Sequence, residues 1–164
     1  MKKERSNLPF RINCEGYFTD SKGNILAYDT GKGYIVFPGG GVNNNESPEE
    51  GLIRETFEET GAIVGDLSKL GVLKIVWWPE WAKTKEQKKR YELFQGEEMH
   101  FFKGFIKEFK NSNLKEKDHW KGDKLMPIKE VIWLIEKNKP FSKGEKEYRE
   151  AQLMFLKNLL SVVS

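Results

Sequence analysis

Three glutamates near the end of one predicted helix carry the strongest chemical signal in this sequence. The stretch "RETFEETG" places Glu55, Glu58 and Glu59 within the last turn and a half before Gly61. At about 100° per residue, their side chains share roughly one third of the helix circumference. Carboxylates at a helix C-terminus are repelled by the backbone dipoles and by one another. A divalent cation reverses this repulsion, because Mg²⁺ prefers carboxylate oxygens together with water and substrate phosphates.

A glutamate-rich surface in water is the other interpretation of this helix end, because exposed acids are common. The opposite side of the helical wheel carries Ile53, Thr56, Phe57 and Thr60, which we expect to face a core. Gly51 lies near the acidic side, where the missing side chain leaves room for another group to approach. The residues that precede the helix decide between the two interpretations.

The sequence marks both ends of this helix. Ser47 is a good N-cap, Pro48 occupies the first helical position, and Glu50 completes a capping box. Gly61 supplies the left-handed residue that commonly ends a helix. These signals predict a helix over residues 48–60.

The rest of the chain alternates between predicted strands and predicted helices. Apolar or alternating stretches predict strands at residues 10–18, 24–30, 33–37, 72–78 and 98–109. Amphipathic or charged stretches predict helices at residues 80–94, 131–137 and 143–163. Strands interspersed with helices predict an α/β fold, in which a mixed β-sheet is covered by helices on both sides.

Composition predicts one globular domain over residues 1–164, in the cytoplasm. Apolar residues make up 38% of the chain and aromatic residues 13%, too much for a disordered protein. The single cysteine, Cys14, cannot form an intramolecular disulfide, which fits a reducing compartment. We expect neither a signal peptide nor membrane association, because no apolar run is long enough. Residues 83–90 hold five basic residues and one acid, so the net charge of +3 reflects one local patch.

From Gly40 onward, the sequence "GGVNNNESPEEGLIRETFEETGA" resembles the Nudix box. Seven positions match that pattern at the required spacing: Gly40, Glu46, Arg54, Glu55, Glu58, Glu59 and Gly61. Thr56 and Ala62 depart from the two aliphatic positions of the pattern, which concerns packing rather than chemistry. The resemblance implies the Nudix α/β/α sandwich and a hydrolase that cleaves a diphosphate linked to a nucleoside, with Mg²⁺ or Mn²⁺.

The resemblance also implies a role for each acidic residue of the box. Glu58 and Glu59 match the direct metal ligands, and Glu55 matches a further ligand or a general base. The Gly40 carbonyl oxygen is expected to complete the metal shell. Metal ions held there would neutralise phosphate charge and lower the pKa of a bound water.

Arg54 is expected to hold these carboxylates, and Glu46, in place through ion pairs. Many relatives use one more acid from outside the box as a ligand or general base. The candidates in this chain are Glu97, Glu98, Glu116 and Asp118. We favour Glu98 because it stands at the start of a predicted strand.

The segment 77–102 interleaves aromatic residues with the basic patch and is a candidate for substrate selection. As a lid, it would stack Trp78 or Trp81 on a base and bring Lys89 or Arg90 to phosphates. The alternative is a charged helix whose aromatic side chains pack on the domain: Trp81, Tyr91 and Phe94.

Two further stretches, "FRINCEG" (10–16) and "RYELFQGEEMHFF" (90–102), look similar to elements of Nudix enzymes that act on dinucleoside polyphosphates or triphosphorylated RNA 5′ ends. In those enzymes an arginine placed like Arg11 approaches the phosphates. This chain has "PGGG" (38–41) where that branch commonly has glutamine after the proline. Arg11 is otherwise explained as an edge-strand surface residue.

The hypothesis that follows is a metal-dependent hydrolase of a nucleoside diphosphate derivative or nucleoside triphosphate. The alternatives are a non-catalytic nucleotide-binding sensor, or a dinucleoside polyphosphate or RNA 5′-end pyrophosphohydrolase as the specific activity. A sensor would not need all three glutamates of the box. The expected partner is a small nucleotide substrate, and the only nucleic acid considered is a 5′-phosphorylated RNA end. The protein is expected to be a monomer or a homodimer.

Overall fold

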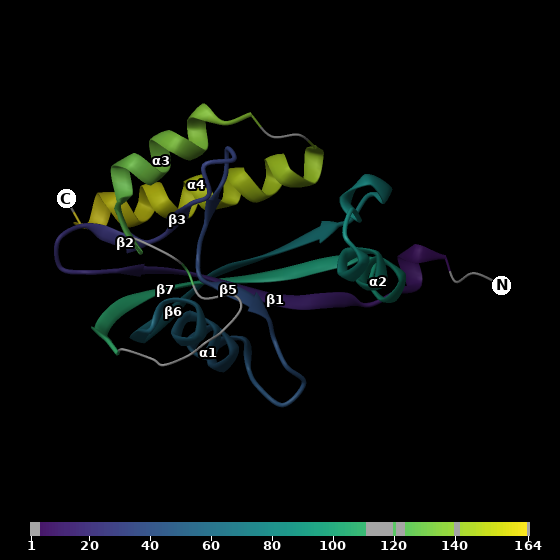
Figure 1. The fold of residues 1–164 in the computed structure, drawn as a ribbon, viewed down its shortest axis with the longest axis horizontal. Helices are drawn as coiled ribbons and strands as arrows, with labels where there is room; N and C mark the ends of the chain where they lie inside the picture. The colour runs from purple at the N-terminus through teal and green to yellow at the C-terminus, as the bar shows by residue number, and fades with distance from the viewer. Residues whose placement is uncertain (1–3, 111–119, 121–123, 140–141, 164) are drawn as a thin grey trace.

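The computed structural model describes residues 4–110, 120, 124–139 and 142–163, and its centre is a mixed β-sheet (Figure 1). The strands lie in the order β6-β7-β1-β2-β8, and β5 pairs with β1 beside this path. Their bounds are β1 Phe10–Thr19, β2 Asn24–Leu26, β5 Gly39–Gly41, β6 Ala62–Val76, β7 Gly96–Phe109 and β8 Leu125–Pro127. A separate two-stranded sheet pairs β3, Tyr28–Asp29, with β4, Ile35–Val36.

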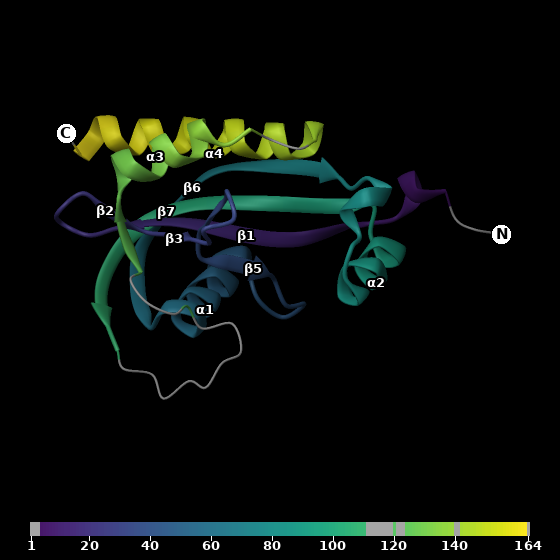
Figure 2. The same ribbon diagram turned by 45° about the horizontal axis from the view of Figure 1, so that its top comes forward.

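Helices cover both faces of the central sheet. Figure 2 shows α1, Pro48–Thr60, on one side, and α3, Ile128–Lys137, with α4, Lys143–Val163, on the other. The short helix α2, Lys85–Leu93, lies at the end of the sheet nearest the N-terminus, with the single turns η1, Arg5–Asn7, and η2, Pro79–Trp81. This arrangement confirms the predicted α/β/α sandwich.

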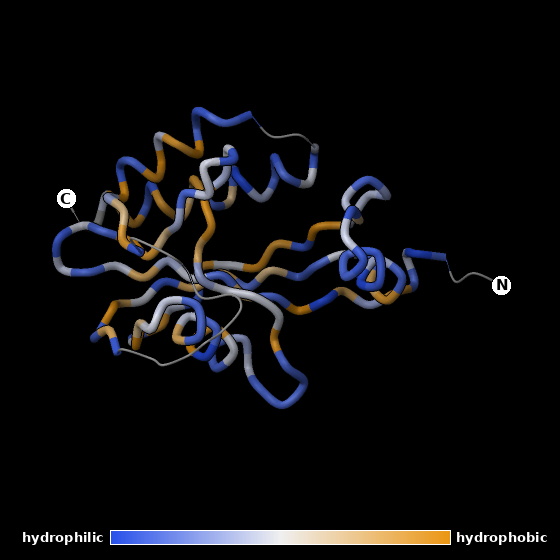
Figure 3. Tube along the Cα trace, in the orientation of Figure 1, coloured by the Kyte–Doolittle hydropathy of each residue, from blue (hydrophilic) through white to orange (hydrophobic). Residues whose placement is uncertain are grey.

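Two apolar clusters fill the spaces between the sheet and its helices. Alternate residues of β1 point to opposite faces, so Tyr17 joins the cluster under α3 and α4, while Cys14 and Phe18 join the cluster over α1. The α3 helix alternates hydrophobic and hydrophilic residues along its turns and buries its apolar side (Figure 3). Within the described residues, no helix combines the length and the apolar character needed to cross a membrane.

The structure corrects several predicted boundaries. The strand expected at 72–78 begins ten residues earlier, at Ala62, because β6 pairs with β7 along its length despite register shifts around Gly65 and Lys69. The glycines and polar residues in the first half of this strand interrupt the alternating apolar pattern by which strands are recognised in a sequence. The helix expected over 80–94 divides into η2 and α2, since Thr84 and Gln87 form a capping box that starts a new helix.

The α1 helix has the predicted bounds but a different buried side. The Ser47 hydroxyl accepts a hydrogen bond from Glu50 N, and Gly61 adopts a left-handed conformation with φ of 74°. Leu52, Thr56 and Thr60 are buried against the sheet, and the two threonine hydroxyls donate to backbone carbonyls one turn earlier. The expectation for Ile53 is wrong, because this side chain is 41% exposed.

One buried carboxyl lies under α4. Glu15 accepts hydrogen bonds from Tyr17, Tyr148 and Gln152, which join β1 to α4. Burial raises the pKa of Glu15, although these three donors act in the opposite direction. We therefore expect the carboxyl to make folding sensitive to pH.

We expect wild-type protein to lose stability relative to Glu15→Gln as the pH rises above about 4, the ordinary pKa of a glutamate. Between the ordinary pKa and the raised one, the folded state holds a proton that the unfolded state has released, so the free energy of unfolding falls with pH. Chemical denaturation at several pH values measures this difference. Glu86→Gln, at an exposed position of α2, is the control, and parallel pH profiles of wild type and Glu15→Gln would contradict the expectation.

Candidate active site

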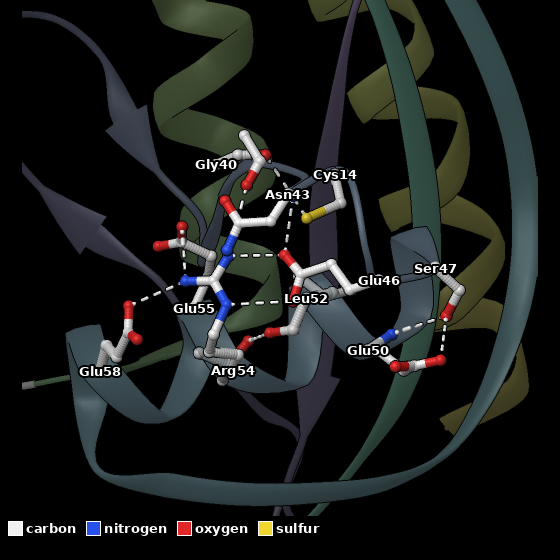
Figure 4. Close-up of polar contacts among 12 residues, drawn as sticks. Cys14, Gly40, Asn43, Glu46, Ser47, Glu50, Leu52, Arg54, Glu55 and Glu58 are labelled. Atoms are coloured by element: carbon white, nitrogen blue, oxygen red, sulfur yellow. Dashed lines mark hydrogen bonds and ion pairs between the residues drawn. The ribbon is translucent and has the colours of Figure 1, made fainter.

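Arg54 lies at the centre of the acidic helix end (Figure 4). Its Nη2 and Nε atoms donate to the two carboxylate oxygens of Glu46, at 2.7 and 3.1 Å. Its Nη1 atom donates to Glu55 at 3.2 Å and to Glu58 at 3.1 Å. Arg54 thus offsets part of the carboxylate repulsion through the ion pairs that the resemblance implies.

The ion pair between Arg54 and Glu46 also joins α1 to the loop that precedes it. The Arg54 hydrogen bonds and the Asn43 backbone N–H lower the pKa of Glu46, while Glu46 in turn raises the pKa of Arg54. A Cβ atom at Gly51 would lie 2.9 Å from a Glu46 carboxylate oxygen. The group that uses the space at Gly51 is therefore the carboxylate of Glu46.

The strand β5 brings backbone groups to the same carboxylates. The Gly39 N–H donates to Glu59 Oε1 at 3.0 Å, and Glu59 is 9% exposed. The Glu55 carboxylate lies beside Gly40, because a Cβ there would be 3.1 Å from Glu55 Cδ. The Gly40 carbonyl oxygen accepts a weak hydrogen bond from the buried Cys14 thiol, and burial raises the pKa of that thiol to about 12.

The donor set at this place suits a hard divalent cation. Gly40, Glu55, Glu58 and Glu59 offer oxygen atoms from two adjacent elements, which is the ligand chemistry that Mg²⁺ and Mn²⁺ prefer. Across the residues that the structure describes, no three acidic, histidine or cysteine side chains are already arranged to hold an ion.

Arg11 extends from β1 toward this acidic group. Its guanidinium lies directly over Gly41, where any side chain would overlap Nη2. Burial and the neighbouring Arg90 lower the pKa of Arg11, whereas Glu97 and Glu55 raise it. A guanidinium remains charged even so. Arg11 is thus a partly buried cation that interacts electrostatically with both Glu55 and Glu97.

An aromatic pocket of about 610 Å³ opens beyond Glu97, on the face of the sheet that α4 covers. Trp77 and Trp81 stack at its wall with ring centroids 3.8 Å apart. The other residues that line it include Tyr34, Ile75, Trp78, Glu80, Lys83, Gln87, Glu97, Ser142, Gly144, Glu145 and Tyr148. The predicted substrate residues Trp78 and Trp81 therefore line one pocket, and Arg90 lies near Arg11 rather than in the lining.

The two acids at the start of β7 point to opposite faces of the sheet. Glu98, the favoured base, pairs with His100 at 2.7 Å and with Lys74 at 3.7 Å, and the His100 hydrogen bond lowers its pKa. Glu97 accepts a hydrogen bond from Asn13 at 2.6 Å, and burial raises its pKa. The other two candidates, Glu116 and Asp118, lie outside the described residues.

Sequence reasoning missed three residues of this region. Asn13, Trp77 and Tyr148 are buried or half-buried, and each contacts an ionisable group or the pocket. No motif marks them, because strand pairing and α4 packing bring them together from distant parts of the chain. The available signals were the polar residue Asn13 within a predicted strand and the place of Trp77 at the start of the segment 77–102.

Comparison with known proteins agrees with this geometry. The NUDIX domain profile matches residues 16–148. An RNA pyrophosphohydrolase from Pasteurella multocida is 30% identical over 93% of this chain and 80% of its own length. An RNA pyrophosphohydrolase from Haemophilus influenzae (strain 86-028NP) is 30% identical over 91% of this chain and 78% of its own length. The fold of a NUDIX hydrolase from Nitrosomonas europaea superimposes with a TM-score of 0.57, at 13% identity over 87% of this chain and 88% of that one. This chain therefore belongs to the NUDIX domain family.

Proposed function

We propose that this protein hydrolyses the diphosphate linkage of a nucleotide derivative with its phosphates over Arg11 and its base in the aromatic pocket. The observation that carries the proposal is that Arg11, whose guanidinium lies over Gly41, interacts electrostatically with both the pocket-lining Glu97 and the box residue Glu55. A bound nucleotide that extends from the pocket toward α1 meets a cation at the place where its phosphates begin.

Each part of the chain has a distinct task in this proposal. Family members generally use divalent metals, and Glu55, Glu58, Glu59 and the Gly40 carbonyl would hold the ions, which supply charge neutralisation and an activated water. Arg54 positions Glu46, Glu55 and Glu58 by ion pairs. Stacking on a pocket tryptophan contributes about 1–3 kcal/mol per base. Glu98 remains the proposed proton acceptor, since its position on β7 faces the side of the sheet that α1 covers.

The substrate class that we propose first is a triphosphorylated RNA 5′ end or a dinucleoside polyphosphate. This choice is supported by two relatives that are RNA pyrophosphohydrolases. The match with this chain covers about four fifths of the length of each. The basic residues of α2 would then meet the nucleotides that follow the first one.

A substrate panel tests the proposal directly. Purified protein with Mg²⁺ or Mn²⁺ is offered triphosphorylated RNA, dinucleoside polyphosphates, nucleoside triphosphates and nucleotide sugars, and products are identified by mass. We expect cleavage at a diphosphate linkage of at least one substrate, and none after chelation of the metal. Tight binding of a nucleotide without turnover of any substrate would favour the sensor over the enzyme.

We expect Arg11→Met to lower kcat/KM by about 10- to 100-fold, because a hydrogen bond to a charged group contributes roughly 1.5–3 kcal/mol. Most of the loss should be in KM if Arg11 binds phosphates equally in the ground state and the transition state. Lys22→Met, at an exposed position in the turn after β1, removes an equal charge and is the matched control. An unchanged kcat/KM for Arg11→Met would remove Arg11 from the phosphate path.

A further inference from the structure

The carboxylate of Glu97 has one accessible oxygen atom that no described residue pairs with. Asn13, which is 5% exposed, donates from Nδ2 to Glu97 Oε2 at 2.6 Å. No described residue donates to the other oxygen, Oε1, and this atom is not sealed from solvent, unlike the Oδ1 atom of Asn13. An ionised carboxylate can only accept hydrogen bonds. Oε1 is therefore a strong acceptor that is available to a donor group of a ligand.

Strand pairing places Glu97 beside Arg11 as well as in the wall of the aromatic pocket. The strands β1 and β7 are parallel, and Arg11 is opposite Glu97 in their register. Their side chains therefore start from the same face of the sheet, on strands about 4.8 Å apart, and their charges interact. Glu97 also lines the pocket, together with Trp78 and Trp81. It thus borders both the proposed place of the base and the proposed place of the phosphates.

We infer that Glu97 recognises the ribose of the substrate, with Oε1 accepting a hydrogen bond from the 2′-hydroxyl group. This inference rests on the proposed function and narrows its substrate to ribonucleotides. The ribose is the group that joins the base to the first phosphate, so it lies beside the residue that borders both places. The 2′-hydroxyl is free in an RNA end and in a dinucleoside polyphosphate, whereas the 3′-oxygen of an RNA end is esterified to the next nucleotide.

A 2′-deoxynucleotide would leave this acceptor without a partner. A site that is built to pair with a hydroxyl group rejects the analogue that lacks it, because the polar group of the protein is then unsatisfied. A hydrogen bond to a charged group corresponds to a factor of about 10 to 150 in affinity. The hydrogen bond from Asn13 holds the carboxylate in one orientation before the ligand arrives. The 2′-hydroxyl is also the group by which a protein distinguishes RNA from DNA.

Equilibrium binding of nucleotides, measured by calorimetry without metal, tests the inference apart from catalysis. We expect ATP to bind at least about tenfold more tightly than 2′-deoxy-ATP. The 2′-deoxy-2′-fluoro analogue of ATP should bind like 2′-deoxy-ATP, because fluorine has nearly the size of a hydroxyl group but cannot donate a hydrogen bond. GTP and 2′-deoxy-GTP should give a similar ratio, since the contact is with the sugar and not with the base.

Glu97→Gln keeps the shape of the side chain and removes its charge, so it should reduce the preference for ATP over 2′-deoxy-ATP to about threefold or less. Glu108→Gln is the matched control, because it makes the same change at an exposed position near the other end of β7, and it should keep the wild-type preference. Equal binding of ATP and 2′-deoxy-ATP by wild type, or an unchanged preference in Glu97→Gln, would overturn the inference.

Two further results separate this inference from the proposed function. Arg11→Met should weaken the binding of ATP and of 2′-deoxy-ATP by the same factor, because both carry the same phosphates. A protein that hydrolyses nucleotides but binds the two sugars equally would overturn the inference alone. A protein that keeps the ribose preference but hydrolyses no member of the substrate panel would overturn the proposed function and support the inference.

A final comparison identifies the source of the ribose. Hydrolysis rates are measured for short 5′-triphosphorylated RNAs with ribose or 2′-deoxyribose in the first nucleotide, and for diadenosine tetraphosphate and its 2′-deoxy analogue. A ribose preference confined to the RNAs assigns the contact to the first nucleotide of an RNA end, and one confined to the second pair assigns it to a dinucleoside polyphosphate. No ribose preference in either pair would contradict the inference.

Discussion

Replacement of Glu59 by glutamine is expected to lower kcat by at least about a hundredfold while the protein stays folded. Glu59 is 9% exposed and accepts a hydrogen bond from the Gly39 N–H at 3.0 Å. Glutamine has the same shape, and its carbonyl oxygen preserves this hydrogen bond. It lacks the negative charge that a divalent cation needs, so the expected loss concerns catalysis rather than folding.

The matched control for this variant is Glu49→Gln in the first turn of the same helix. Glu49 is exposed and lies at the opposite end of α1 from the acidic group. Its kcat should stay within about twofold of wild type, because surface substitutions away from special features have small effects. Thermal unfolding is measured for both variants with and without Mg²⁺. A Glu59→Gln variant with wild-type turnover, or one that unfolds without metal, would assign Glu59 a purely structural role.

Gly39→Ala should have the largest effect on stability, with a loss of about 3 kcal/mol or more. A Cβ atom at this position would overlap the Cys14 carbonyl oxygen, which is backbone and cannot rotate away. The φ angle of Gly39 is 156°, which side-chain-bearing residues rarely adopt. The strand β5 must therefore separate from β1, and Gly40 then moves away from Glu55.

The control for Gly39→Ala is Gly23→Ala in the turn between β1 and β2. Gly23 also has a positive φ angle, 80°, but a Cβ there meets no atom within 4 Å. We expect this variant to cost only about 1 kcal/mol, from the backbone conformation alone. Chemical denaturation measures both, and turnover of soluble Gly39→Ala should also be low. Equal stability losses in the two variants would show that the contact with Cys14 is relieved by small shifts.

Local signals in the sequence were sufficient for α1 and for the donor set at its end. Ser47, Pro48 and Gly61 determine where the helix begins and ends, because capping and left-handed turns involve only neighbouring residues. The spacing of Glu55, Glu58 and Glu59 puts these residues near one end and one side of the helix for the same reason. The ion pairs of Arg54, which the resemblance to the Nudix box implied, are present, and the one with Glu58 joins helix positions four residues apart.

Orientation of the helix and the strands required the tertiary structure. Ile53 is exposed and Glu59 buried because Thr56 and Thr60, whose hydroxyls bond to the helix backbone, allow α1 to approach the sheet closely. The first half of β6 was missed because its pairing with β7, and not its own composition, makes it a strand.

The sequence by itself identified the carboxylates of the acidic helix end, on which the proposed chemistry depends, and its resemblance to the Nudix box identified the arginine that pairs with them. Only the tertiary structure brought together the residues of the proposed nucleotide site, because Arg11 and Glu97 come from the adjacent strands β1 and β7, which are far apart in the chain. A shift of one residue in the register of β7 would exchange Glu97 with Glu98 between the two faces of the sheet. That register is set by contacts between residues far apart in the chain, which no local pattern records.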